Sequence, residues 1–185
     1  MDPDRDDAAR LCRGDTAGLA GLMGRHQDRL FRYLLRLVGD EAVAEDTFQQ
    51  TWVQVAERIG RYDASRPFAP WLFTLARNLG IDHLRRRWPE SLDEVNELAA
   101  PAGIESDPLA HAVARERTGR VAAALCALSP LDREVLCLRF EEDMALPQVA
   151  RTLGVPVPTA KARLYRALAR LREFMLAGAA EEEWR

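Results

Sequence analysis

The chain has 185 residues, of which 48% are hydrophobic and 30% charged, and its formal net charge at pH 7 is -3. This length suits one domain or two small ones, and the composition is that of an ordinary globular protein. No apolar run approaches the ~20 residues of a membrane span, and the acidic start MDPDRDDAAR cannot act as a secretory signal, so we expect a cytoplasmic protein without direct membrane insertion.

The first part of the chain predicts helices separated by short breaks. Residues 1–21 form an N-terminal extension with room for a first helix. Residues 22–38 place apolar side chains on one face of an amphipathic helix, which ends at Gly39. The chain shows no alternating strand pattern, so the expected fold class is all-α.

A second amphipathic helix is predicted over residues 41–59. Its apolar side chains recur at helical spacing and should face the core: Phe48, Trp52, Val55 and Ile59. Another face carries Asp46, Gln49, Gln50 and Val53. These side chains could meet a protein partner, although plain exposure to solvent explains the spacing at least as well.

Residues 60–70 form a loop that mixes cations with aromatic rings. Its glycine and prolines exclude regular structure. Tyr62, Arg66 and Phe68 suit unstacked bases, because every base presents a π-face and every nucleotide presents a phosphate.

A helix follows from about residue 70 to 88. Its polar side chains outside the apolar face are Arg77, Asn78, Asp82, Arg85 and Arg86.

Residues 89–118 have the composition of a linker. They hold seven acidic residues against two arginines, and proline and glycine interrupt any helical pattern. We therefore expect two small helical domains, residues 22–88 and 119–176, joined by a flexible acidic linker and followed by an acidic tail at 177–185. The cysteines and histidines have no ligand-like spacing, so we expect no metal site and no cofactor.

Residues 144–172 carry the pattern of a helix-turn-helix. Pro147 can begin a short helix, Gly154 breaks it, and a second helix with leucines on one face follows two more prolines. The second helix is cationic on its other face. A solvated amphipathic helix is the alternative, but the turn length and the clustered cations favour a DNA-reading pair, in which arginine can bind a phosphate or a guanine.

Two stretches of the chain together resemble the extracytoplasmic-function (ECF) sigma factors of bacterial RNA polymerase, in the sigma-70 family. The first is AEDTFQQTWVQVAERIGRYDASRPFAPWLFTLARNLGIDHLRRR, and the second joins LSPLDREVLCLRF to PQVARTLGVPVPTAKARLYRAL. The resemblance implies a sigma2-like helical bundle that binds the clamp helices of core RNA polymerase and melts the minus-ten promoter element. It also implies a sigma4-like domain that reads minus-thirty-five DNA and binds the flap, and an anti-sigma factor that holds the protein inactive.

The resemblance assigns roles to single residues. Polymerase binding falls to Asp46, Gln49, Gln50 and Trp52, and Gln50 stands where the family usually has glutamate. Minus-ten recognition falls to Tyr62, Arg66, Phe68, Trp71, Arg77, Asn78, Asp82, Arg85 and Arg86. Minus-thirty-five recognition falls to Thr159, Lys161, Ala162, Arg163, Tyr165 and Arg166. The family often has serine at the positions of Ala145 and Ala162, so a helix cap worth about 1 kcal/mol and a hydroxyl group are missing.

Two other functions fit parts of the pattern. A sigma-like decoy that only binds an anti-sigma protein would be expected to lose its basic recognition face, which this chain keeps. A helix-turn-helix repressor would leave residues 41–88 without a role. An enzyme with a small-molecule substrate is not expected, because the sequence offers no nucleophile with a base, no paired carboxylates and no phosphate loop.

Overall fold

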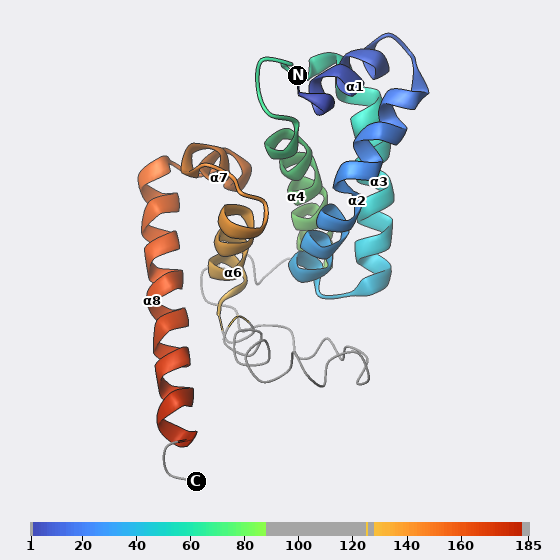
Figure 1. The fold of residues 1–185 in the computed structure, drawn as a ribbon. Coiled ribbons are helices and arrows are strands. Elements are labelled where there is room, and N and C mark those ends of the chain that lie inside the picture. Colours follow the sequence, from blue (N-terminus) through green and yellow to red (C-terminus); the bar gives the residue numbers. More distant parts are fainter. Residues whose placement is uncertain (1, 88–124, 126–127, 183–185) are drawn as a thin grey trace.

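The computed structural model describes residues 2–87, 125 and 128–182, which exclude the predicted linker at 89–118. Every regular element in this part of the chain is helical, which confirms the predicted fold class, and the helices form two groups (Figure 1). The first group is α1 (Pro3–Cys12), α2 (Thr16–Val38), α3 (Glu41–Arg58), the 3-10 turn η1 (Ile59–Arg61) and α4 (Phe68–Arg87). The second is α6 (Pro130–Leu136), the π-helical turn η2 (Cys137–Glu141), α7 (Leu146–Leu153) and α8 (Val157–Glu182).

Three helix boundaries differ from the prediction. α2 begins at Thr16 rather than at residue 22, because the Asp15 side chain accepts a hydrogen bond from the amide of Ala17 and caps the helix. α4 begins at Phe68, two residues before the predicted start. α8 continues to Glu182, so most of the predicted tail at 177–185 is helical.

α1 packs along the start of α2, and the contact depends on glycine and on charge. A Cβ atom at Gly18 would lie 2.3 Å from the carbonyl oxygen of Asp7, so only glycine permits this close approach. Arg25 of α2 binds Asp4 at 2.7 Å and Asp7 at 2.8 Å. The predicted first helix therefore exists and is fixed to the first domain.

The core of the first domain lies between α2, α3 and α4. The predicted inward residues of α3, and Ile59 of η1 directly after it, are buried, except Phe48, which is half-buried. Thr47 and Thr51 are buried as well, and the hydroxyl of Thr51 donates to the carbonyl oxygen of Thr47 at 2.7 Å. This bond explains how a threonine can lie on the buried face of a helix. The fully buried large side chains of this core are Leu22, Leu30, Leu34, Val55, Phe68, Leu72 and Phe73.

A buried carboxylate connects the helices of the second domain. Asp132 of α6 has no exposed surface and binds Arg166 at 3.0 Å and Arg170 at 2.8 Å, both on α8. A charge that is buried so completely needs partners of opposite charge. Asp132 therefore fixes the direction in which α8 leaves the domain. The apolar core around it includes Leu128, Val135, Leu138, Met144, Val149 and Leu153.

The helix-turn-helix has the predicted form. Gly154 ends α7 with a φ of 67°, a left-handed conformation that favours glycine, and α8 begins at Val157. Ala145 is the N-cap of α7 and offers no side-chain acceptor to the first turn. Only the reverse half of the cap is present, since the amide of Ala145 donates to Gln148 Oε1 at 2.7 Å.

The two domains pack against each other. α4 lies beside α7 (Figure 1). The hydroxyl of Thr74 on α4 lies 3.4 Å from the hydroxyl of Thr152 on α7. Side chains of α2 reach α6 and η2, where Tyr33 donates to Glu134 at 2.7 Å. The structure therefore shows a closed arrangement of the two domains.

Replacing Ala145 with serine is expected to stabilise the second domain by about 1 kcal/mol, because the hydroxyl can accept a hydrogen bond from an amide in the first turn of α7. Urea unfolding followed by circular dichroism measures the change. Ala162→Ser is the matched control, because it adds the same hydroxyl to the exposed part of α8, where serine is slightly unfavourable. Equal effects of the two substitutions would contradict the assignment of the cap.

Candidate nucleic-acid and polymerase interface

The exposed face of α3 carries most of the side chains predicted to bind polymerase. Asp46, Gln49 and Gln50 are exposed, and Val53, one turn further on, is 56% exposed. An apolar side chain among polar ones suits contact with another protein. Trp52 is only 5% exposed and faces the core, as its helical spacing predicts, and its assignment to polymerase binding stays a prediction. The helix turns Trp52 into the core, where it holds α3 in place.

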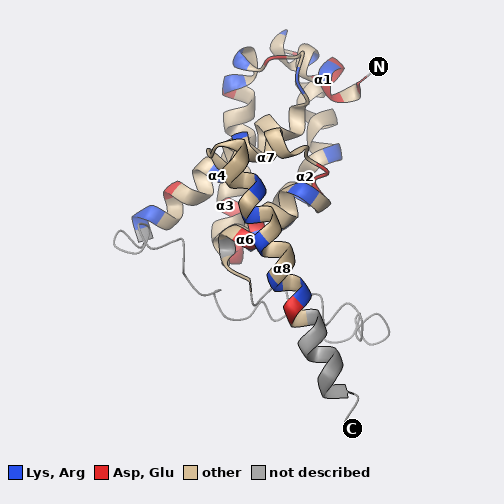
Figure 2. Ribbon diagram, turned by 90° about the vertical axis from the view of Figure 1, so that its left-hand side faces the viewer, with Lys and Arg blue, Asp and Glu red and all other residues tan. Residues whose placement is uncertain are grey.

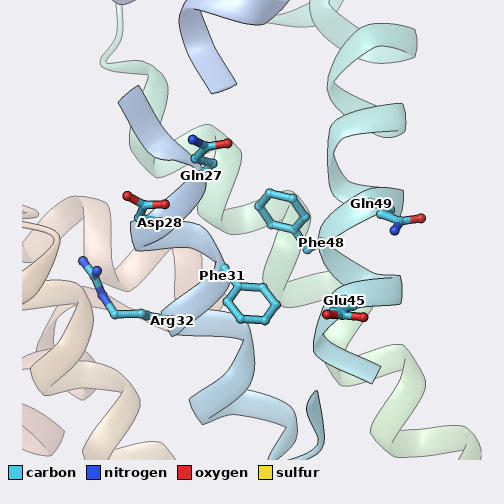
Figure 3. Close-up of a pocket in the computed structure, with 7 residues that line it drawn as sticks. All are labelled: Gln27, Asp28, Phe31, Arg32, Glu45, Phe48 and Gln49. Carbon is cyan, nitrogen blue, oxygen red and sulfur yellow. The ribbon is translucent and has the colours of Figure 1, made fainter. Parts of the chain in front are cut away.

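An open groove of about 560 Å³ runs beside this face, between α2 and α3 (Figure 3). The rings of Phe31 and Phe48 meet edge to face there, with 5.9 Å between their centroids. Polar side chains from both helices surround the two rings. These are Gln27, Asp28 and Arg32 of α2 and Glu45 and Gln49 of α3. The groove thus continues the predicted polymerase face at Gln49.

Three aromatic rings cluster where the predicted base-binding loop meets α4. The centroid of Tyr62 lies 5.5 Å from that of Phe68 and 5.3 Å from that of Trp71. Tyr62 and Trp71 are half-buried, so part of each ring is accessible. Burial, assisted by nearby carboxylates, raises the pKa of Tyr62 to about 12, so its phenol stays protonated at neutral pH.

Phe68 lies beneath these two rings and is only 1% exposed. His26 of α2 covers its other side, with 5.4 Å between the ring centroids. In this structure Phe68 therefore belongs to the core and supports Tyr62 and Trp71, and its assignment to minus-ten recognition stays a prediction. Arg66, by contrast, is exposed on the loop and pairs with Asp63 at 3.1 Å.

A polar groove of about 330 Å³ lies between α3 and α4. Four of the predicted minus-ten residues line it, namely Arg77, Asn78, Asp82 and Arg85. Two residues of α3 that were not predicted from the sequence, Gln54 and Arg58, complete the groove from the other side. Their spacing of four residues places them on one helix face and could have indicated a shared site. Three arginines and two amides suit an anionic, hydrogen-bonding ligand such as a nucleic-acid strand. Arg86, the remaining predicted residue of α4, is exposed outside the groove.

The second helix of the helix-turn-helix presents the predicted minus-thirty-five residues on α8. Lys161, Ala162 and Tyr165 are exposed, while Thr159 and Arg163 are half-buried. The ammonium group of Lys161 lies 5.9 Å from the centroid of the Tyr165 ring. Cationic residues recur along successive turns of this helix (Figure 2).

Arg166 lies partly on this face and partly against the core of the second domain. Half of its side chain is exposed, but its guanidinium also binds the buried carboxylate of Asp132. Arg170 shares the same carboxylate, one turn further along α8. Arg166 is thus held in a fixed orientation at the edge of the predicted DNA-reading face.

No group of three or more His, Cys, Asp or Glu side chains within the described residues could hold a metal ion. No helix in the same part of the chain is both long and apolar enough to cross a bilayer. Cys137 is buried, and burial raises the pKa of its thiol to about 12, so the thiol stays protonated. The α3 face, the aromatic cluster, the polar groove and the exposed face of α8 offer charged groups, hydrogen-bonding groups and aromatic rings, all of which suit the binding of a macromolecule.

Two family models match the chain in sequence order. The model for sigma-70 region 2 matches residues 22–90, and the model for sigma-70 region 4 matches residues 118–171. The ECF RNA polymerase sigma factor SigL of Mycobacterium tuberculosis is 35% identical over 162 residues, which cover 85% of this chain and 89% of SigL. The RNA polymerase sigma factor CarQ of Myxococcus xanthus is 31% identical over 167 residues, which cover 90% of this chain and 94% of CarQ.

Solved structures agree with these matches. CnrH in complex with the cytosolic domain of CnrY superposes with a TM-score of 0.68 and 27% identity, over 95% of this chain and 99% of CnrH. RpoE of Bartonella quintana in complex with the anti-sigma factor NepR gives a TM-score of 0.59 and 25% identity, over 79% of this chain and 89% of RpoE. The fold and both family regions are those of sigma-70-type transcription initiation factors. Within that class, the chain belongs to the family of ECF RNA polymerase sigma factors.

Removing the Phe68 ring by the substitution Phe68→Ala should lower the free energy of unfolding of the first domain by about 3–5 kcal/mol, because it leaves a cavity beneath Tyr62 and Trp71. Trp71→Ala should cost less, because Trp71 is only half-buried. Urea unfolding measured by circular dichroism compares the two variants. Unchanged stability in Phe68→Ala would mean that this ring lies on the surface and is free to contact a base.

Proposed function

We propose that this chain binds core RNA polymerase, directs it to specific promoters and helps to melt them, and that an anti-sigma factor holds it inactive. The observation that carries the proposal is the helix-turn-helix, whose second helix directs Lys161, Tyr165 and half of the Arg166 side chain away from its own core. Exposed cations and an aromatic ring at the front of such a helix can position and read a DNA major groove.

The first domain supplies the contacts to melted minus-ten DNA. Tyr62 and Trp71 present partly exposed rings on which an unpaired base can stack, which offsets part of the cost of unstacking. The polar groove between α3 and α4 begins at Arg77, six positions after Trp71 on α4, and its arginines can bind the phosphates of the same strand. Asn78, exposed in this groove, can donate and accept hydrogen bonds with a base edge.

Core polymerase and the anti-sigma factor are the protein partners. Polymerase docks on the α3 face of Asp46, Gln49, Gln50 and Val53, where its clamp helices find polar groups around one apolar side chain. The flap contacts the second domain. An anti-sigma factor is supported by the solved structures of CnrH and RpoE, each of which is a complex with a second protein.

The chain itself makes no covalent bond in this scheme. Polymerase carries out the chemistry, and the sigma factor contributes binding energy and position. Because its partners are polymerase and DNA, the protein acts in the cytoplasm. A decoy that never touches DNA would not require the exposed Lys161 and Tyr165 of α8.

Transcription in vitro tests the proposal. The purified chain is mixed with bacterial core polymerase and a library of genomic fragments, and the transcripts are sequenced. Defined start sites that share two promoter elements are the expected result. If the chain does not bind core polymerase, or if all transcripts start at random, the proposed function is refuted.

Arg166→Ala is expected to reduce transcription from the promoters found in this way by a factor of about 5–150, because a bidentate arginine contact with a base contributes about 1–3 kcal/mol. Affinity for core polymerase should not change. Arg170→Ala is the matched control, because Arg170 binds the same buried carboxylate but lies outside the predicted reading face. Equal losses in the two variants would show that Arg166 acts only by holding α8 to Asp132.

A further inference from the structure

Three carboxylates of the second domain bind three arginines of the first domain. Glu134 of α6 accepts from Arg77 Nε at 2.9 Å, and Glu142, directly after η2, pairs with Arg29 Nε at 3.0 Å. Glu141 of η2 pairs with Arg36. The acids all belong to the second domain and the bases all belong to the first, so the closed arrangement has complementary charge across its seam.

Glu134 is the centre of this seam. The residue is only 6% exposed, and its Oε1 atom accepts hydrogen bonds from both Arg77 and the hydroxyl of Tyr33. Its Oε2 atom is buried and has no hydrogen-bond partner. Desolvation of a carboxylate whose second oxygen is unpaired costs free energy. This cost offsets part of the attraction between Glu134 and Arg77, so the free energy needed to separate the domains stays small.

The two outer ion pairs, Glu142 with Arg29 and Glu141 with Arg36, also hold the domains together only weakly. Burial raises the pKa of Glu142, although Arg29 opposes this shift. Glu141 and Arg36 are both partly exposed, so solvent screens their attraction. When the seam opens, water can hydrate every one of these charges again.

Arg77 belongs to two sites at once. It lines the polar groove between α3 and α4, beside Arg58, Asn78 and Arg85. In the closed arrangement its side chain is only 15% exposed, and the carboxylate of Glu134 neutralises its charge. Of the three arginines that line the groove, Arg77 is thus neutralised from the second domain as long as the domains stay together, and Arg85 pairs with Asp82 of the groove itself at 3.9 Å.

We propose that Glu134 is a built-in competitor for nucleic acid at Arg77. Its carboxylate occupies the arginine while the domains are closed, and separation of the domains releases that arginine to a phosphate of the melted strand. This inference rests on the proposed function and adds a means of regulation to the same site. It makes the free chain a weak binder of single-stranded DNA and couples domain opening to minus-ten binding.

The test compares Glu134→Gln and Arg77→Ala in the full chain. The radius of gyration is measured by X-ray scattering, and the affinity for a labelled random 20-nucleotide single-stranded DNA is measured by fluorescence anisotropy. Both substitutions break the pair, so both should increase the radius of gyration. Only Glu134→Gln leaves Arg77 free, so it should bind the DNA about fivefold more tightly, whereas Arg77→Ala should bind no more tightly than the unmodified chain.

Glu173→Gln is the control for net charge, because it removes one exposed carboxylate from α8. An equal gain in affinity for Glu173→Gln and Glu134→Gln, or an unchanged radius of gyration in Glu134→Gln, would overturn the inference. Glu141→Gln, which breaks only the partly exposed outer pair, gives a second reading if Glu134→Gln does not fold. It should open the seam and raise DNA affinity to a smaller extent, and no change in either quantity would also overturn the inference.

Transcription by the unmodified chain with core polymerase separates this inference from the proposed function. If the unmodified chain initiates at defined promoters while the DNA affinity of Glu134→Gln stays unchanged, the competitor is refuted and the function stands. If the unmodified chain supports no initiation, the proposed function fails, and the competitor fails with it.

Discussion

Two buried carboxylates on one short helix determine how the described parts of this protein fit together. α6 has seven residues, and Asp132 and Glu134 are separated by about 200° around its axis, so they point to nearly opposite sides. Asp132 binds Arg166 and Arg170 and orients α8 within its own domain. Glu134 binds Arg77 and Tyr33 and attaches the first domain. The direction of the predicted DNA-reading helix and the closure of the two domains thus depend on opposite sides of a single helical turn.

Arginine rather than lysine makes this arrangement workable. The chain has 26 basic residues, and Lys161 is the single lysine. A planar guanidinium offers several donors in a fixed fork and is more weakly hydrated than an ammonium group, so it pairs with a buried carboxylate at a smaller desolvation cost. The one lysine lies on exposed α8, where a hydrated point charge is an advantage. The net charge of -3 is therefore a poor guide to DNA binding, because several acids are buried against arginines.

Helical periodicity predicted the all-α fold and the helix-turn-helix, because these depend on residues close in sequence. Gly154 and the capping positions of α7 are examples of such local signals. The resemblance assigns binding roles to Trp52 and Phe68, which the structure buries, because a family motif mixes residues that contact a partner with residues that support them from the core. No sequence pattern could indicate the seam, since Tyr33 and Glu134 are 101 positions apart and the pairing of their side chains exists only in the folded chain. The spacing of Gln54 and Arg58 indicates a shared face of α3, but the sequence does not show that this face borders α4, where the groove forms.

The two carboxylates also differ in what happens when DNA takes their arginines. If Arg166 turns toward a base, Arg170 still neutralises Asp132, so the completely buried charge keeps a partner and the second domain stays intact. Glu134 would keep neither of these two partners, because Arg77 and Tyr33 both belong to the other domain and move away together. Glu134 can lose the hydrogen bonds from Arg77 and Tyr33 only because opening the seam exposes its carboxylate to water at the same moment. In the proposed scheme, minus-thirty-five reading is therefore compatible with an intact second domain, whereas binding of Arg77 to minus-ten DNA would require that the domains separate.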